Sequence, residues 1–367
     1  MEGQPFLVEH QRLATSGARA VLAFTAGDAL RLAVPQLAID VPGTPANMNG
    51  GDSNIDMPLY RWSGGHFVED GSLPVPGGED AEFFRIGEDE FLATASIRSG
   101  QGPYELNVES MLFRREGDGW VEFQTFPTFA GKQWHFLEFD GRRFLALAQG
   151  VVFDGIDARH PRTSRLYEWN GTAFVEFQIF DGRWGYNFEF FVWQGRKFLC
   201  YADHVSASQI LVWDGQRFAP FQNLAAHGGR AFAFFEAEGQ GWLAFANIFG
   251  ESLLYRWDGE RFVQVQVLSG PGGREFALLR TSAHLYLAQI NFIHGTPAAP
   301  KPDLMSSLSR WDGEQFRLVA EFATSGGTDA AWFVADGEMF LAVSNSLTPD
   351  IRFRADTVIY RLDDNDK

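Results

Sequence analysis

Residues 253–268, LLYRWDGERFVQVQVL, decide the fold, because they predict two short strands joined by a tight turn. Tyr255 and Trp257 precede the dipeptide Asp258-Gly259, and Phe262 follows it. Aromatic and β-branched residues on both sides of Asp-Gly are typical of a β-hairpin. A single hairpin is not stable in water, so this one must pack against other strands.

Close copies of this hairpin recur along the chain. They begin at Leu59, Leu112, Leu166, Ile210 and Leu308. The position of Trp257 is held in these copies by Trp62, Arg115, Trp169, Trp213 and Trp311, and the spacing runs from 44 (213 − 169) to 54 (169 − 115) residues. A second hairpin follows each copy: a Gly precedes one strand, and a segment such as FLATAS (91–96) forms the next. The repeating unit therefore contains four strands.

The seventh unit is divided between the two ends of the chain. Residues 358–362, VIYRL, begin another hairpin, and its partner strand is FLVEHQRL at residues 6–13. Strands from both ends that share one blade would close a ring without a free sheet edge. The sequence therefore predicts one all-β domain over residues 1–367: a seven-bladed β-propeller of four-stranded antiparallel blades, closed by its N- and C-terminal strands. Blade 7 is predicted to combine about 6–36 with 358–362.

The composition limits the kinds of partner. The net charge of −17 makes the protein acidic, and a nucleic acid or an anionic membrane surface is a poor partner for it. No apolar run reaches the roughly 18–20 residues of a membrane span, so we expect no membrane insertion. The first residues, MEGQPFLVEHQRL, lack the basic and apolar regions of a signal peptide, which predicts a soluble, cytoplasmic protein.

The repeat resembles a known family. The pattern LYRW-G-F-V-Q, followed by a Gly, two Phe and F-L-A-x-A-N, is similar to the EAR repeat, also called the EPTP or epitempin repeat, over about residues 6–362. The resemblance implies a β-propeller. The family that it points to includes extracellular neuronal and hair-cell proteins that bind partner proteins through this domain. It also places the strand after the Gly innermost in each blade. Some members hold a cation in the central channel.

Long connections and polar residues predict where a site lies. Five connections between the second and third strands of a blade are long, so they should gather on one face: about 35–58, 97–110, 150–164, 292–307 and 346–356. We aligned the innermost strands on Gly17, Gly78, Gly131, Gly185, Gly229, Gly273 and Gly327. Two positions further on stand Arg19, Asp80, Gln133, Asn187, Ala231, Glu275 and Asp329. Four positions further on stand Val21, Glu82, His135, Glu189, Ala233, Ala277 and Ala331. Because side chains alternate along a strand, both columns are predicted to face the channel.

Three interpretations of these columns remain open. The polar side chains could hydrogen-bond to one another and to water, which would stabilise the ring without a further role. Asp80, Asp329 and Glu275 could bind Ca²⁺, since they offer the oxygen ligands that it takes, although Arg19 could neutralise Asp80 or Asp329 directly. Glu82, His135 and Glu189 could instead form an acid–base set.

Two functions follow from these interpretations. The first is a binding scaffold for a protein, glycan or small-molecule ligand, which uses the loop-rich face and the polar channel mouth. Its ligand-binding residues would be Arg19, Gln133, Asn187, Trp134 and Tyr186, although such aromatic residues are more often core between blades. The second is a cytoplasmic enzyme that acts on an apolar or aromatic small molecule, with Glu82, His135 and Glu189 as its catalytic groups. No cofactor is certain, and Ca²⁺ in the channel is the candidate.

Overall fold

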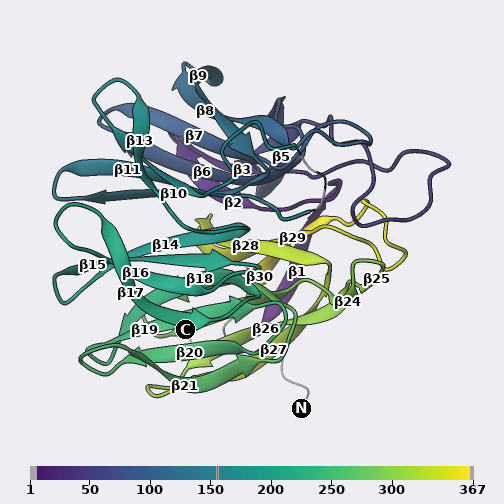
Figure 1. The fold of residues 1–367 in the computed structure, drawn as a ribbon. Coiled ribbons are helices and arrows are strands. Elements are labelled where there is room, and N and C mark those ends of the chain that lie inside the picture. The colour runs from purple at the N-terminus through teal and green to yellow at the C-terminus, as the bar shows by residue number, and fades with distance from the viewer. Residues whose placement is uncertain (1–5, 154, 156, 364–367) are drawn as a thin grey trace, which may run out of the picture.

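The computed structural model describes residues 6–153, 155 and 157–363, and these residues form seven four-stranded antiparallel sheets. The sheets surround a common axis, with the long connections at one end and short turns at the other (Figure 1). The first strands of neighbouring sheets contact one another around the axis. The predicted seven-bladed β-propeller is confirmed.

Each sheet forms one blade, and its four strands run in order from the innermost, next to the axis, to the outermost. The innermost strands are β2 (Leu22–Ala26), β6 (Gly78–Ile86), β10 (Gly131–Phe139), β14 (Gly185–Trp193), β18 (Gly229–Ala237), β22 (Gly273–Arg280) and β28 (Gly327–Ala335). The second strands are β3 (Ala29–Ala33), β7 (Asp89–Ser96), β11 (Arg142–Gln149), β15 (Arg196–Asp203), β19 (Gln240–Asn247), β23 (Leu285–Asn291) and β29 (Glu338–Asn345). The third strands are β4 (Met57–Ser63), β8 (Asn107–Glu116), β12 (Arg165–Trp169), β16 (Ser208–Trp213), β20 (Ser252–Trp257), β26 (Asp303–Trp311) and β30 (Thr357–Leu362).

The outermost strands complete the blades, which we number 1 to 7 in the order given. They are β5 (His66–Leu73), β9 (Gly119–Phe129), β13 (Phe174–Ile179), β17 (Phe218–Ala225), β21 (Phe262–Ser269), β27 (Phe316–Ser325) and β1 (Leu7–Leu13). A small hairpin, β24 (His294–Thr296) and β25 (Ala299–Lys301), lies in the connection between β23 and β26.

The two ends of the chain meet in blade 7, as the sequence predicts. β1 pairs antiparallel with β30, from Leu7 opposite Leu362 to Leu13 opposite Thr357. The bounds of this blade differ from the prediction, because β2 and β3 pair with β4 and β5 in blade 1. Segment 6–36 is thus divided between two blades, because the sequence repeat begins at the third strand of a blade and ends at the second strand of the next.

The Asp-Gly hairpins form for a local reason. Asp258 Oδ1 accepts hydrogen bonds from the backbone N–H groups of Glu260 and Arg261, both at 2.9 Å. Gly259, which directly follows Asp258, has a φ of 110°, in the left-handed region that favours glycine. The side chain thus fixes the turn that joins β20 to β21.

Glutamine side chains join the outermost strands of neighbouring blades. Gln124 Nε2 donates to the carbonyl of Phe174 at 2.8 Å, and its Oε1 accepts from the N–H of the same residue at 3.0 Å. Gln178, Gln222 and Gln266 make the same pair of bonds to the next blade. Gln11 of β1 does so to Phe67 of β5, which joins blade 7 to blade 1, at 2.7 and 2.8 Å.

Candidate functional site

A β-bulge near the start of the innermost strands sets the geometry of the channel mouth. In β10, Gly131 pairs with Gln149 and Gln133 pairs with Ala148, so Lys132 is an extra residue with no partner of its own. The same shift occurs at the start of β6, β14, β18, β22 and β28. A bulge breaks the alternation of side chains. The extra residue and the residue after it therefore both line the channel mouth.

We call the seven residues at this bulge position the mouth ring. It consists of Arg19, Glu79, Lys132, Tyr186, Arg230, Arg274 and Thr328. In blade 1 the residue that corresponds to the leading Gly is Ala18, which bridges to Gln36, and not Gly17. The predicted alignment was thus wrong by one residue in this blade, and Arg19 belongs with Glu79 rather than with Asp80.

The sequence prediction missed five of the seven mouth-ring residues. Regular alternation would turn the position directly after the Gly away from the channel, and only the bulge returns it. The signal that could have found them is the residue type. These five positions hold Glu79, Lys132, Arg230, Arg274 and Thr328, which are polar or charged residues at one fixed place in strands that are otherwise mostly apolar.

Glu79 is the carboxylate of the mouth ring. Arg19 binds it with two nitrogens, at 2.9 Å to Oε1 and 3.3 Å to Oε2. Lys132 Nζ and Arg274 Nη2 lie 3.6 and 3.9 Å from Oε2. Burial alone would raise the pKa of Glu79, but Arg19, Lys132 and Arg274 together lower it to about 2. The expected pairing of Arg19 with Asp80 or Asp329 is replaced by this ion pair.

Tyr186 lies among three cations. The centroid of its ring is 3.9 Å from Arg230 Cζ, 4.9 Å from Arg274 Cζ and 5.2 Å from Lys132 Nζ. Such contacts between a cation and an aromatic face are attractive. Burial alone would raise the pKa of Tyr186, but Arg230, Lys132 and Arg274 lower it to about 7. Four of the mouth-ring residues, all within the described part of the chain, are thus cationic.

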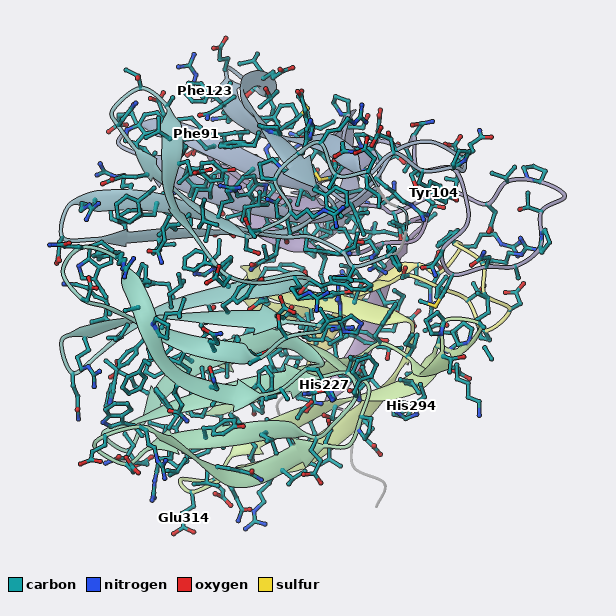
Figure 2. The ribbon with its side chains drawn as sticks, in the orientation of Figure 1. Phe91, Tyr104, Phe123, His227, His294 and Glu314 are labelled. Atoms are coloured by element: carbon teal, nitrogen blue, oxygen red, sulfur yellow. The ribbon has the colours of Figure 1, made fainter. Side chains whose placement is uncertain are left out.

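A cavity of about 1190 Å³ opens above the mouth ring on the loop-rich face. Four of the five long connections contribute residues to its lining. Tyr104 and His294, which line it, lie towards the end with the long connections, whereas Phe91 and Glu314 lie towards the opposite end (Figure 2). The prediction that long connections gather on one face is confirmed.

One side of the cavity is an aromatic wall, formed by Phe153, Trp184, His204 and Phe249. The ring centroids of Phe153 and Trp184 are 5.3 Å apart, those of Trp184 and His204 are 4.7 Å apart, and those of His204 and Phe249 are 4.9 Å apart. Phe153 and Phe249 are 54% and 56% exposed, which is unusual for phenylalanine. Burial and Arg230 lower the pKa of His204 to about 3, so its ring is neutral at pH 7.

The column next to the mouth ring joins the blades. Asp80 Oδ2 accepts from the N–H of Trp134 in the next blade at 2.7 Å, and Gln133 Oε1 accepts from that of Phe188 at 2.8 Å. Asp329 makes the corresponding bond from blade 7 to blade 1, to the N–H of Val21 at 2.9 Å. Asn187 accepts from Phe232 at the longer distance of 3.4 Å. These groups satisfy backbone donors that would otherwise lack a partner.

The deeper column does the same. Glu82 Oε1 accepts from the N–H of Phe136 at 2.9 Å, and His135 Nε2 accepts from that of Phe190 at 3.1 Å. Burial raises the pKa of Glu82 to about 7 and lowers that of His135 to about 4. Among the described residues no hydrogen bond joins Glu82 to His135. Acid–base catalysis by Glu82, His135 and Glu189 stays a prediction, and these contacts give the residues a structural role.

The carboxylates proposed for Ca²⁺ make hydrogen bonds within the protein. Asp329 Oδ1 and Glu275 Oε1 each accept from the backbone N–H of the following residue, at 2.7 and 3.0 Å. Burial raises the pKa of Asp80 and of Glu275 well above the ordinary values, which favours their neutral forms. Within the described ranges, no three His, Cys, Asp or Glu side chains gather closely enough to hold a metal ion. Calcium binding stays a prediction.

The two aromatic candidates differ in their surroundings. Tyr186 lines the cavity. Trp134 is 1% exposed, its Nε1 donates to the carbonyl of Thr94 at 3.0 Å, and it packs against Phe126 and Tyr167 in the core between blades. A ligand in the cavity therefore cannot reach Trp134 without displacing core residues.

Replacing Glu189 by Gln is expected to stabilise the protein at about pH 9 and to have little effect at about pH 5. Burial raises the pKa of Glu189 from 4.5 to about 8, so its stabilising contribution is complete below pH 4.5 and is lost as the pH rises through about 8. Gln keeps a neutral acceptor for the N–H of Phe234, as Gln133 does for Phe188. We expect the free energy of unfolding, measured in urea, to rise by about 4 kcal/mol at pH 9 and by less than about 1 kcal/mol at pH 5.

Glu122→Gln is the matched control, because Glu122 is an exposed residue of β9 and its replacement removes the same charge. Its effect should be small and equal at the two pH values. Equal effects of Glu189→Gln at both pH values would contradict the prediction.

Comparisons with known proteins agree with the repeat. Residues 173–214 and 217–258 match the model of the EPTP domain. The chain is 29% identical over 168 residues to a mouse protein named "Thrombospondin-type laminin G domain and EAR repeat-containing protein", which is 44% of this chain and 24% of that protein. Its human counterpart is 28% identical over 135 residues, 36% of this chain and 19% of that protein. The chain thus matches about a quarter or less of these relatives.

No helix among the described residues could cross a membrane.

Proposed function

Because this chain carries EPTP repeats on a seven-bladed β-propeller, we propose that it is a binding module that receives its ligand or partner in the cavity of the loop-rich face. The observation that carries the proposal is the aromatic wall. Phe153 and Phe249 are more than half exposed at the rim of a cavity of about 1190 Å³. Exposed aromatic side chains around a concave site are typical of binding surfaces.

The rest of the scaffold supports a rigid site. The side chains of Asp80, Gln133 and Asp329 hydrogen-bond to the backbone of the next blade, which fixes the innermost strands relative to one another. The cavity is built on these strands and on the connections that follow them. A site on rigid elements needs little ordering when it binds, which favours affinity.

A thermal-shift screen with a wall variant tests the proposal. The library contains cationic, neutral and anionic organic compounds and short peptides. Compounds that raise the Tm of the natural protein by about 2 °C or more should not do so for the double variant Phe153→Ser, Phe249→Ser. We expect the variant to fold normally, because both side chains are largely exposed.

The control is Val175→Ser, Leu318→Ser, which removes two exposed apolar side chains from the outer strands β13 and β27. It should keep every shift that the natural protein shows. Shifts that survive equally in the wall variant would show that the ligands bind elsewhere and would overturn the proposal.

A further inference from the structure

The floor of the cavity carries more positive charge than its surroundings neutralise. Arg19 already binds Glu79 with two nitrogens, and Lys132 and Arg274 approach the same carboxylate at distances longer than hydrogen bonds. No carboxylate of the described residues lies within 4 Å of an Arg230 guanidinium nitrogen. Arg230 packs on the ring of Tyr186 instead. A buried cation without a carboxylate partner is costly, so a bound anion would stabilise this arrangement.

Arg230 has a donor that the protein does not use. The residue is 6% exposed and lines the cavity. Its Nη1 donates to the carbonyl of Gly229 at 2.9 Å and lies 2.9 Å from His204 Nδ1, which is the acceptor because this ring is neutral. Its Nε has no hydrogen-bond partner among the described residues. Trp184 Nε1, on the aromatic wall, is a second such donor.

The depth of the charges indicates the size of the ligand. Lys132 and Arg230 are buried at the floor of the cavity, whereas Phe153 and Phe249 stand at its rim. Arg274 lines a smaller pocket of about 210 Å³, which shares Lys132 and Arg230 with the cavity. A molecule that reaches both must place an acidic group at the bottom and an apolar body against the wall. A cavity of about 1190 Å³ has room for an organic molecule of this kind. The net charge of −17 disfavours a polyanion such as a nucleic acid.

We propose that the cavity binds a small organic anion, whose carboxylate, phosphate or sulfonate contacts Arg230 and Lys132 and whose apolar or aromatic body lies on the aromatic wall. This rests on the proposed function of the same cavity and names its ligand class. It differs from the Ca²⁺ interpretation of the channel, which was based on the carboxylates of Asp80, Asp329 and Glu275. The bulged strands concentrate positive charge at one place in an acidic protein.

The test compares two fluorescent probes with the same kind of aromatic body. 8-Anilinonaphthalene-1-sulfonate carries one sulfonate, and N-phenyl-1-naphthylamine carries none. The sulfonate probe should bind the natural protein at least about tenfold more tightly than the neutral probe, because a charged hydrogen bond contributes that much. Arg230→Gln should weaken the sulfonate probe about tenfold and leave the neutral probe unchanged. Inorganic sulfate should displace the sulfonate probe and should not displace the neutral probe.

Arg217→Gln is the matched control, because Arg217 is an exposed residue of the short turn between β16 and β17 and loses the same charge. It should change the affinity of either probe less than about twofold. The Tm of each variant is measured first. If Arg230→Gln does not fold, Lys132→Gln and the sulfate competition on the natural protein replace it.

Several outcomes would overturn the proposal. One is equal affinity of the two probes, and another is an equal response of the sulfonate probe to Arg230→Gln and Arg217→Gln. A third is binding of an acidic ten-residue peptide when the sulfonate probe does not bind. Neutral or cationic compounds whose shifts depend on Phe153 and Phe249 would refute the anion and leave the proposed binding role intact.

Discussion

A chain that lacks residues 1–14, and with them β1, is expected to lose its cooperative unfolding transition. β1 is the outermost strand of blade 7, and it pairs with β30 along its whole length. Its removal exposes the edge of β30, uncovers the core next to Leu362 and removes the Gln11 bonds to Phe67. The loss should exceed about 5 kcal/mol, which is comparable with the whole stability of many domains. Thermal unfolding followed by circular dichroism measures it.

Adding the missing strand back separately provides the control. A synthetic peptide of residues 6–14 should restore part of the transition when it is mixed with the shortened chain, because it can pair with the open edge of β30. Gln11→Ala, which removes only the side-chain bonds from blade 7 to Phe67 of blade 1, should cost about 1 kcal/mol. A shortened chain with an unchanged Tm would show that the closure of blade 7 is not needed for stability.

Gly229→Ala is expected to lower the free energy of unfolding by about 3 kcal/mol, although the change is a single methyl group. A Cβ atom at Gly229 would lie 2.1 Å from Ser208 Oγ and 3.1 Å from the carbonyl oxygen of Asp203. Ser208 is fully buried and accepts a hydrogen bond from the N–H of Asp203, so it cannot move without losing that bond. The contact recurs at Gly185 with Ser164 and at Gly273 with Ser252. Unfolding in urea measures the change.

A second substitution tests whether Ser208 is the cause. Ser208→Ala alone should cost about 1 kcal/mol for the lost hydrogen bond. In the Ser208→Ala background, Gly229→Ala should cost clearly less than in the natural protein, since the closest contact is gone. Gly270→Ala is the neutral control, because nothing lies within 4 Å of a Cβ atom at this position. A strictly additive double variant would contradict the explanation.

The fold could be predicted from the sequence because each unit repeats its local signals. The Asp-Gly turns, the position of Trp257 and the partner strands at the two chain ends are properties of short segments, and counting them gave the number of blades. The columns of Asp80 and Glu82 were also found, because regular alternation holds on the far side of the bulge. What they contact could not be predicted, since each bonds to the backbone of the next blade, 54 residues further on.

Five residues of the mouth ring were missed for a different reason. A bulge depends on how two strands pair, and the sequence of the innermost strand alone does not show it. In blade 1, Gly17 directly precedes Ala18, the residue that corresponds to the leading Gly of the other blades. The sequence alignment therefore started at Gly17, one residue too early, and placed Arg19 in a different column from Glu79. The Ca²⁺ interpretation took Arg19 into account but not Lys132, Arg230 and Arg274.

The bulge has a consequence for how this architecture can diversify. Five of the mouth-ring residues line the cavity, while the residues after them hold the blades together and tolerate little change. Among the described residues, Lys132, Tyr186 and Arg230 carry no blade-joining backbone bond of this kind, so their blades offer evolution sites that can be exchanged while the framework stays. Changes at these sites, made one at a time around a single opening, would let related propellers acquire new specificities.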